Sequence, residues 1–211
     1  MLHPEAVKTT TLELLKLLQK KEYLEGFHLV GGTALALYYG HRISVDIDLF
    51  SNFDFDAEHL LENIQQDFSY QLYSTAQYTL KGRIENINVD IIAHRYPYLQ
   101  SPHDMGGISM LSVQDIIAMK LNAISVSGQR TKDFIDIYYS FENYSIGEMV
   151  EFYKIKYDQQ NASHVLKSLI YFDDVDSVDW PILIKDPELK WATVKKRIEK
   201  EVIQFVEKDD Q

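Results

Sequence analysis

The sequence predicts an α+β fold in which a small sheet flanked by helices is followed by a helical domain. Before about residue 93, apolar and polar residues alternate with a period of two in several short stretches, as they do in half-buried strands. After about residue 112 the apolar residues recur at helical spacing instead. The loop His94–Gly107, which contains two prolines and a glycine pair, separates the two patterns. We therefore expect two domains, at residues 1–110 and 111–211.

The first domain is expected to combine helices and strands. Leucines at helical spacing predict a helix over about residues 5–25, which ends near Gly26. Asp56 can cap a later helix, because an Asp side chain accepts hydrogen bonds from the free N–H groups of a first helical turn. Strands are expected at Phe27–Val30, Asp46–Phe50, Tyr70–Ser74 and Ile87–Ile92, and Lys81-Gly82 is interpreted as a turn between the last two.

The second domain is expected to contain only helices. The segment Ser112–Asp115 resembles a capping box and opens a helix that Gly128 closes. A following helix, Thr131–Tyr139, places Asp133 and Asp136 on one face, because residues three apart are neighbours on a helix. Later helices are expected at Glu148–Tyr157, at Ala162–Phe172, and from Pro187 in a first turn to about Val206.

The composition is that of an ordinary globular protein. Of the 211 residues, 45% are hydrophobic and 25% are charged. No apolar run approaches the roughly 20 residues of a membrane span, and no basic segment with an apolar stretch opens the chain as in a secretory signal. The absence of cysteine excludes disulfides and thiolate zinc sites. We therefore expect a cytoplasmic protein with no membrane partner.

The net charge of −11 argues against a general nucleic-acid binder, because contact with a phosphate backbone requires a basic surface. Any contact with RNA would have to be confined to a small basic area. The acidic run Asp173–Asp179 is expected to be a solvated face, with a docking surface for a basic partner as the alternative. The candidates for the basic area are Lys81, Arg83, Arg95, Arg130 and Lys132.

A glycine pair followed by two acids is the strongest functional signal. Asp46 and Asp48 are expected to point to the same face, since residues i and i+2 of a strand do so. Two such carboxylates suit a hard cation, and Mg²⁺ is commonly bound by one or two carboxylates together with substrate phosphates. Gly31 and Gly32 allow a ligand to approach the backbone closely. Thr33 begins the next helix, so its hydroxyl and the first free N–H groups can hold phosphate oxygens.

The stretch from Leu29 to Phe50 resembles the first motif of the polymerase-beta-like nucleotidyltransferase superfamily, in the form seen in the AbiEii abortive-infection toxin family. The family pattern is a glycine pair with Ser or Thr, followed by an Asp-x-Asp strand. The resemblance implies a minimal nucleotidyltransferase core with a small mixed sheet in residues 1–110, and a helical domain in residues 111–211 that completes the active-site cleft. It also implies nucleotide transfer from a nucleoside triphosphate with Mg²⁺ (or Mn²⁺), by the toxin of a type IV toxin–antitoxin pair.

Later residues extend the resemblance to about residue 140. The superfamily carries a third carboxylate on the strand beside Asp-x-Asp, and Asp90, between apolar neighbours, is the matching position. In the family a lysine is expected to meet the triphosphate, and Lys120 is the match. Asp133 and Asp136 either pair with Lys120 and Arg130 or line the nucleotide pocket, and these alternatives stay open.

Three functional hypotheses follow from these residues. The first is a nucleotidyltransferase toxin that modifies RNA or a protein. The second is a catalytically inactive nucleotide-binding or protein-interaction module of the same fold. The third is a nucleotidyltransferase antitoxin that modifies a partner protein. The histidines near the motif, His28, His41 and His94, are expected to be structural.

Overall fold

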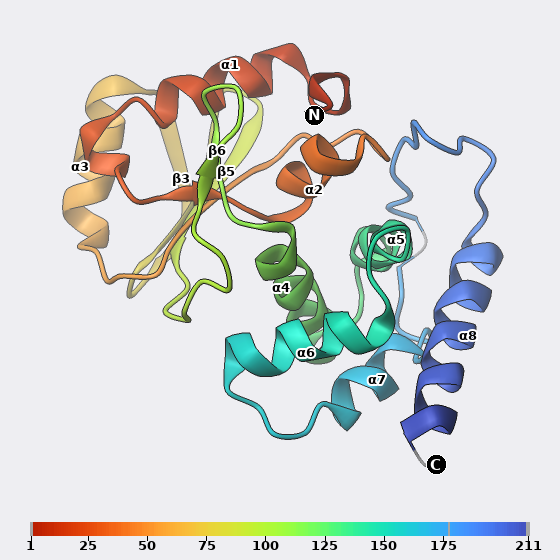
Figure 1. The fold of residues 1–211 in the computed structure, drawn as a ribbon. Coiled ribbons are helices and arrows are strands. Elements are labelled where there is room, and N and C mark those ends of the chain that lie inside the picture. Colours follow the sequence, from red (N-terminus) through yellow and green to blue (C-terminus); the bar gives the residue numbers. More distant parts are fainter. Residues whose placement is uncertain (1, 177, 210–211) are drawn as a thin grey trace. The chain divides into compact units, whose positions relative to one another are not determined.

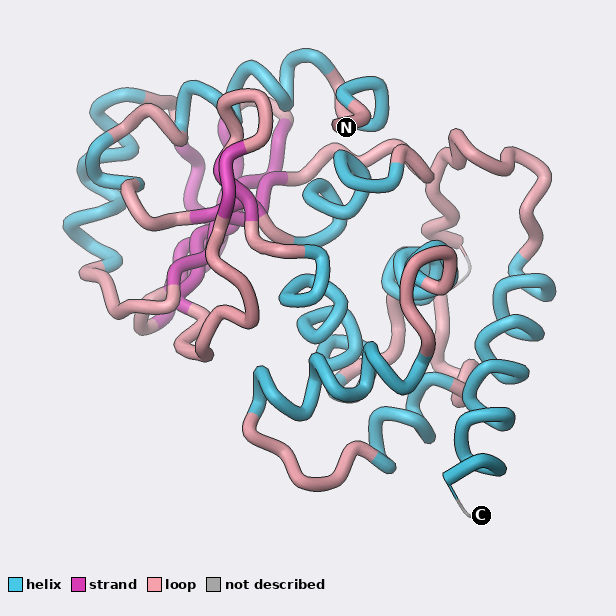
Figure 2. Tube along the Cα trace, in the orientation of Figure 1, coloured by secondary structure: helices cyan, strands magenta, loops and turns pink. Residues whose placement is uncertain are grey.

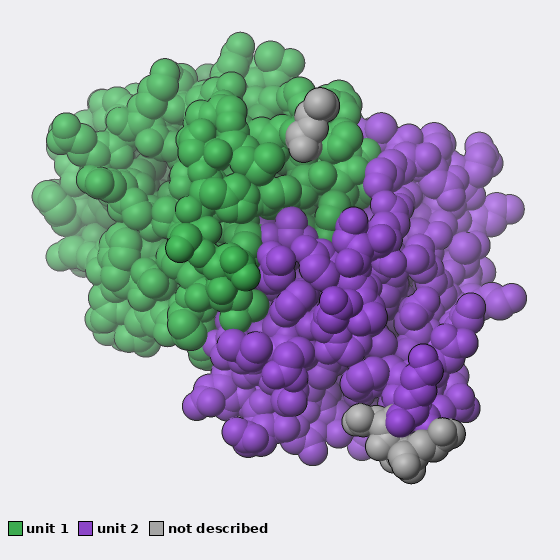
Figure 3. Space-filling model, in the orientation of Figure 1, with its two compact units in different colours: residues 1–112 green, residues 113–211 purple. Residues whose placement is uncertain are grey.

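The computed structural model describes residues 2–176 and 178–209. The chain divides into two compact units, residues 1–112 and residues 113–211, which are coloured separately in Figure 3. The division lies two residues from the boundary expected between 110 and 111. Each unit has buried apolar side chains of its own, Leu29 and Leu49 among them in unit 1, and Leu121 and Phe134 in unit 2.

Unit 1 is built on a mixed sheet (Figures 1 and 2). Its seven strands have the order β3-β4-β5-β2-β1-β7-β6. β2 runs parallel to β5 and β1 runs parallel to β7, whereas the other neighbouring strands are antiparallel. The predicted α+β class, with a mixed sheet in the first half, is confirmed. The strands are β1 (His28–Leu29), β2 (Ile47–Ser51), β3 (Tyr70–Ala76), β4 (Thr79–Ile84), β5 (Ile87–Ala93), β6 (His103–Asp104) and β7 (Ser109–Met110).

The N-terminal region is broken into three short helices, so the single helix predicted over residues 5–25 is wrong. Val7 is extended and forms a parallel bridge with Ser44, which prevents a helix from running through it. This long-range pairing cannot be read from the spacing of the leucines. The three helices are η1 (Pro4–Ala6), α1 (Thr9–Leu18) and η2 (Glu22–Leu24).

The helices α2 (Gly31–Tyr39) and α3 (Ala57–Asp67) complete unit 1. The predicted cap of α3 is confirmed, because the Asp56 carboxylate accepts hydrogen bonds from the backbone N–H groups of Glu58 and His59. α3 packs against β3 and β4.

β4 is a strand that the sequence reading missed. Lys81 and Gly82 lie inside it and do not form a turn, and the actual turns on either side have Tyr78 and Glu85 at positive φ. Gly82 is needed because β3 passes close by: a Cβ at this position would lie 2.4 Å from the carbonyl oxygen of Gln71. The glycine therefore marks close approach of two strands.

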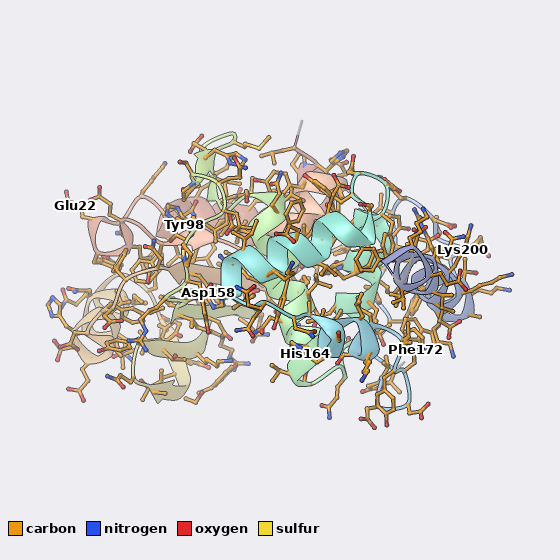
Figure 4. All side chains as sticks on the ribbon, turned by 60° about the horizontal axis from the view of Figure 1, so that its bottom comes forward. Glu22, Tyr98, Asp158, His164, Phe172 and Lys200 are labelled. Atoms are coloured by element: carbon orange, nitrogen blue, oxygen red, sulfur yellow. The ribbon has the colours of Figure 1, made fainter. Side chains whose placement is uncertain are left out.

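Unit 2 is helical, and α4 packs against α5, α6 and α7. Two predicted boundaries are wrong. The closing helix begins at Trp191 and not at Pro187, and the helix predicted to reach Phe172 ends at Leu169. Phe172, labelled in Figure 4, instead packs against Trp191 with ring centroids 5.5 Å apart. The helices are α4 (Val113–Val126), α5 (Thr131–Ser140), α6 (Ile146–Tyr157), α7 (Ser163–Leu169) and α8 (Trp191–Asp209).

None of the helices in the described part of the chain combines the length and the apolar character that crossing a membrane requires.

Candidate functional site

Two carboxylates lie side by side on the polar face of the sheet in unit 1. Asp48 of β2 is in register with Asp90 of the parallel strand β5. Neighbouring strands are about 4.8 Å apart, so the two side chains lie side by side on the same face of the sheet. Both are half-buried, whereas Leu49 and Ile91 on the opposite face are fully buried. The structure thus brings together the second acid of the Asp-x-Asp pair and the predicted third carboxylate.

Asp46 lies just before β2 and is held by a residue that the sequence reading did not select. Its Oδ1 accepts a hydrogen bond of 2.9 Å from the side-chain amide of Asn88. Asn88 stands two residues before Asp90 in β5, so the two side chains share a face. That spacing was a signal available in the sequence. Asp46, Asp48, Asn88 and Asp90 therefore form one polar group on the sheet.

A lysine supplies positive charge to this group. The Lys81 ammonium lies 3.4 Å from Oδ2 of Asp90, its registered neighbour on β4. Nearby, the Tyr70 hydroxyl donates to the carbonyl of Val89, and burial, with the charge of Asp90, raises the pKa of Tyr70. The tyrosine therefore stays protonated at neutral pH.

The donor set fits a hard divalent cation, although it is not a ready-made cage. Carboxylate oxygens are the ligands that Mg²⁺ prefers, and the ammonium of Lys81 beside Asp90 shows that cationic charge is stabilised there. Within residues 2–176 and 178–209, however, no three His, Cys, Asp or Glu side chains already form a metal-binding cluster. Oδ1 of Asp46 accepts a hydrogen bond from Asn88, so a cation held by all three acids would use Oδ2 of Asp46 or displace this hydrogen bond.

The glycine pair lets charged side chains approach the start of α2. Gly31 has φ +69°, and a Cβ there would lie 2.4 Å from Oδ2 of Asp48. At Gly32 a Cβ would lie 2.2 Å from a guanidinium nitrogen of Arg42, which is buried. The first N–H groups of a helix have no partner within the helix and attract negative charge. Acidic, basic and N–H groups thus meet at the N-terminus of α2.

Thr33 has a different place from the one expected. Its side chain is 1% exposed, and its hydroxyl donates to the carbonyl oxygen of Asp46 and lies 2.9 Å from the Ser44 hydroxyl. The backbone N–H of Ser44 donates in turn to Ala6, so the segment that carries Asp46 is held from two sides. The hydroxyl of Thr33 is therefore directed at Asp46, and a phosphate contact by this residue remains a prediction for its backbone N–H.

In unit 2, Lys120 is buried between two acids of α5. Its ammonium lies 2.6 Å from Oδ1 of Asp133 and 2.9 Å from Oδ2 of Asp136. The three side chains are 9%, 5% and 0% exposed. Of the two roles considered for the acids, the structure shows the pairing with Lys120. A contact between any of them and a nucleotide remains a prediction.

A second buried ion pair in unit 2 was not anticipated. Lys156 of α6 lies 2.7 Å from Asp115 of α4, and both side chains are 0% exposed. From the sequence, Asp115 was expected only as part of a capping box. A lysine within the helix Ile146–Tyr157 gave no sign of burial, because lysines are almost always exposed.

The residues expected to form a basic area contact different partners in the structure. Arg83 faces the same side of the sheet as Lys81, whereas Arg95 follows β5 and pairs with Asp54. Arg130 precedes α5 and forms a parallel bridge with Asp176 of the acidic run.

The acidic run Asp173–Asp179 also contacts the start of α5. Lys132 lies 2.7 Å from Asp179, and Asp173, Asp174 and Asp179 are exposed. Residue 177 of the run lies outside the described residues. The run thus combines a solvated face with contacts to the start of α5, and its possible use by a basic partner remains a prediction.

The three histidines occupy packed positions, as expected for structural residues. His28 contacts the hydroxyl of Ser109, and burial lowers its pKa. His41 is buried, and its ring packs against Tyr39 with centroids 5.7 Å apart. His94 packs against Tyr96.

The fold is similar to those of several solved structures. MenT4, a nucleotidyltransferase toxin from Mycobacterium tuberculosis H37Rv, matches 92% of this chain and 84% of its own, with a TM-score of 0.55 and 15% identity. JHP933 from Helicobacter pylori matches 96% of this chain and 99% of its own, with a TM-score of 0.50 and 15% identity. At these identities the likeness concerns the fold alone.

Sequence comparison identifies relatives directly. The protein aq_aa25 of Aquifex aeolicus (strain VF5) is 30% identical over 187 residues, which cover 86% of this chain and 88% of the relative. The family model described as nucleotidyl transferase AbiEii toxin, type IV TA system, matches residues 13–208. This match contains the glycine pair, the three carboxylates and the Lys120 group described above. The chain therefore belongs to the AbiEii nucleotidyltransferase toxin family, and the protein is a nucleotidyltransferase.

Proposed function

We propose that this nucleotidyltransferase is a toxin that transfers a nucleotide from a nucleoside triphosphate to an RNA or protein acceptor, with Mg²⁺ or Mn²⁺, and that a cognate antitoxin restrains it. The observation that supports the proposal most strongly is the registered pair Asp48 and Asp90 beside the glycine-opened start of α2. This arrangement places carboxylate oxygens that can bind a cation next to backbone N–H groups that can bind phosphate. In the reaction, an acceptor hydroxyl would attack the α-phosphorus, and pyrophosphate would leave.

The proposed roles follow from the contacts of each residue. Asp46, Asp48 and Asp90 would hold the cation, and when bound it would neutralise charge on the attacking and leaving oxygens. The backbone at Gly31, Gly32 and Thr33 would hold phosphate oxygens, because a helix N-terminus favours anions. Asn88 would orient Asp46, and the Thr33 hydroxyl would fix the backbone of Asp46.

For unit 2 the proposed contribution is charge. Lys120 would meet the phosphates beyond the α-phosphorus, as a compact ammonium suits that contact. Asp133 and Asp136 would set the position of Lys120, since both already pair with it. Arg130, directly before α5, would be a further nucleotide-binding residue.

Transfer can be tested with nucleoside triphosphates labelled at the α-phosphorus. Each of the four common nucleoside triphosphates would be incubated separately with the protein and Mg²⁺, in the presence of either total RNA or total protein. We expect label in one macromolecular fraction, and no label when the metal is chelated. Labelling that persists after chelation would contradict the metal requirement, and labelling of neither fraction would contradict the proposed reaction. Expression of the active chain without a partner should stop growth.

Thr33 provides a prediction that separates positioning from phosphate binding. Thr33→Val keeps the shape of the side chain but removes the donor to Asp46, which costs about 1–3 kcal/mol for a buried group left without its partner. We expect kcat to fall about tenfold while KM for the nucleotide changes little, and Thr33→Ser to restore kcat. A large rise in KM with unchanged kcat would instead place the hydroxyl on a phosphate.

A further inference from the structure

The polar face of the sheet continues beyond the carboxylates into a group of side chains that are exposed or half-buried. In β4, Arg83 is in register with Asn88 of β5 and with Gln71 of β3. The Arg83 Nε donates to Oε1 of Gln71 at 2.8 Å, and its guanidinium lies 5.8 Å from the ring centre of Tyr73. Gln71, Tyr73 and Arg83, here termed the Tyr73 platform, therefore share the face of Asp46 and Asp90.

The distance to the carboxylates is short. The strands β2, β5, β4 and β3 are successive neighbours in the sheet, and each step is about 4.8 Å. The platform thus begins one strand away from Asn88 and Asp90. A chain molecule whose end lies at the carboxylates would pass over these side chains.

The chemistry of the platform suits an unpaired base and its phosphate. Tyr73 is 57% exposed although it is a large aromatic residue. An exposed aromatic ring beside a guanidinium is the combination on which proteins stack the bases of single strands. The side-chain amide of Gln71 adds a hydrogen-bonding group at the same place.

A peptide is less well suited to the same place. β3 is one edge of the sheet, and an added strand would need a regular row of backbone N–H and C=O groups. The pairing of β3 with β4 shifts register between Leu72 and Ser74, and such a bulge interrupts the row and twists an edge away from pairing. The side chains of the platform, in contrast, lie on the sheet face.

We propose that the Tyr73 platform binds the end of a single-stranded RNA acceptor and directs its terminal hydroxyl toward the carboxylates. This proposal rests on the proposed function and specifies its acceptor. Tyr73 stacks on a base near the terminus, and Arg83 contacts the adjoining phosphate. Because few phosphates are neutralised, the slope of log affinity against log salt is shallow, about −0.7 for each phosphate contacted.

The test measures binding separately from catalysis. The probe is a single-stranded oligoribonucleotide with a fluorophore at its 5′ end, titrated with the full chain by fluorescence anisotropy. We expect Tyr73→Ala to raise Kd about tenfold, as loss of one stacked base does, and Tyr73→Phe to stay near wild type. Arg83→Gln should weaken binding and reduce the salt slope. In transfer assays, Tyr73→Ala should raise KM for RNA and leave KM for the nucleotide unchanged.

The matched control is a second arginine stacked on a tyrosine. The Arg95 guanidinium lies 5.2 Å from the ring centre of Tyr78, beyond the other end of β5. Arg95 was among the expected basic candidates, but it pairs with Asp54 away from the platform, so Arg95→Gln should bind RNA like the wild type. Equal losses in the Arg83 and Arg95 variants, or unchanged binding in Tyr73→Ala, would overturn the platform.

The outcomes also distinguish failure of the proposed RNA-binding platform from failure of the proposed nucleotide transfer. Transfer to RNA that is unaffected by Tyr73→Ala would retain the reaction and overturn the platform. Tyr73-dependent RNA binding without transfer to any acceptor would retain the platform and overturn the reaction. Transfer to protein alone would overturn the assignment of RNA as the acceptor.

Discussion

Asp48→Asn is expected to lower the rate of nucleotide transfer by at least about 1,000-fold while the protein stays folded. Stabilisation of phosphate charge by a bound cation is worth several kcal/mol, and each 1.36 kcal/mol is tenfold in rate. Asp48 lies in register with Asp90, so the change removes one of two neighbouring negative charges. Asparagine also keeps the size of this half-buried side chain, so the variant should still unfold in a cooperative thermal transition. Single-turnover rates and thermal unfolding of the same preparation measure the two quantities.

Asp54→Asn is a suitable control, because Asp54 is an exposed acid of unit 1 that pairs with Arg95. It should leave both the rate and the melting temperature near those of the wild type. If Asp48→Asn labelled an acceptor at close to the wild-type rate, Asp48 would not hold the cation. If it unfolded the protein, the carboxylate would be structural.

The part of the site encoded in one continuous segment was predictable. The glycine pair, Thr33 and the Asp-x-Asp pair lie within a short stretch, and the alternation around them indicates a strand with one polar face. The register of Asp48 with Asp90 was not predictable from spacing, because it depends on which strands become neighbours. The resemblance to a family, not the periodicity, supplied Asp90.

The missed elements have the same cause. Gly82 suggested a turn because its reason, the close approach of β3, is a contact between strands. Val7 left the helical pattern because it pairs with Ser44. In both cases a tertiary contact overrode a local preference. The sequence shows the local preference but not the residue that makes the contact.

Burial of charge was the least predictable feature. Lysines are almost always exposed, so helical spacing alone favours solvated lysines at 120 and 156, and only the resemblance to a family set Lys120 apart. The structure buries both, each against acids from another helix. Lys120 and Lys156 are thus both buried lysines that pair with carboxylates of a neighbouring helix. Only Lys120 matches the family's triphosphate lysine. This contrast allows structural and functional roles to be separated.

Lys120→Met is expected to destabilise unit 2 by about 3–5 kcal/mol, because it leaves Asp133 and Asp136 buried without their cation. Replacing a complete buried ion pair by well-packed hydrophobic residues of similar volume is often neutral or stabilising. The triple variant Lys120→Met, Asp133→Leu, Asp136→Leu should therefore recover most of the lost stability. Denaturant unfolding of each variant measures this recovery.

Stability and activity should then separate. For the control pair, Lys156→Met should destabilise to a similar extent. Lys156→Met with Asp115→Leu should recover both stability and nucleotide transfer, since that pair joins α4 to α6 and lies outside the motif that resembles the family's triphosphate lysine. The triple variant at Lys120 should recover stability but not transfer, and should lose more affinity for a nucleoside triphosphate than for the monophosphate. Transfer that returned together with stability would show that Lys120 is structural, because a phosphate contact beyond the α-phosphorus cannot be replaced by methionine.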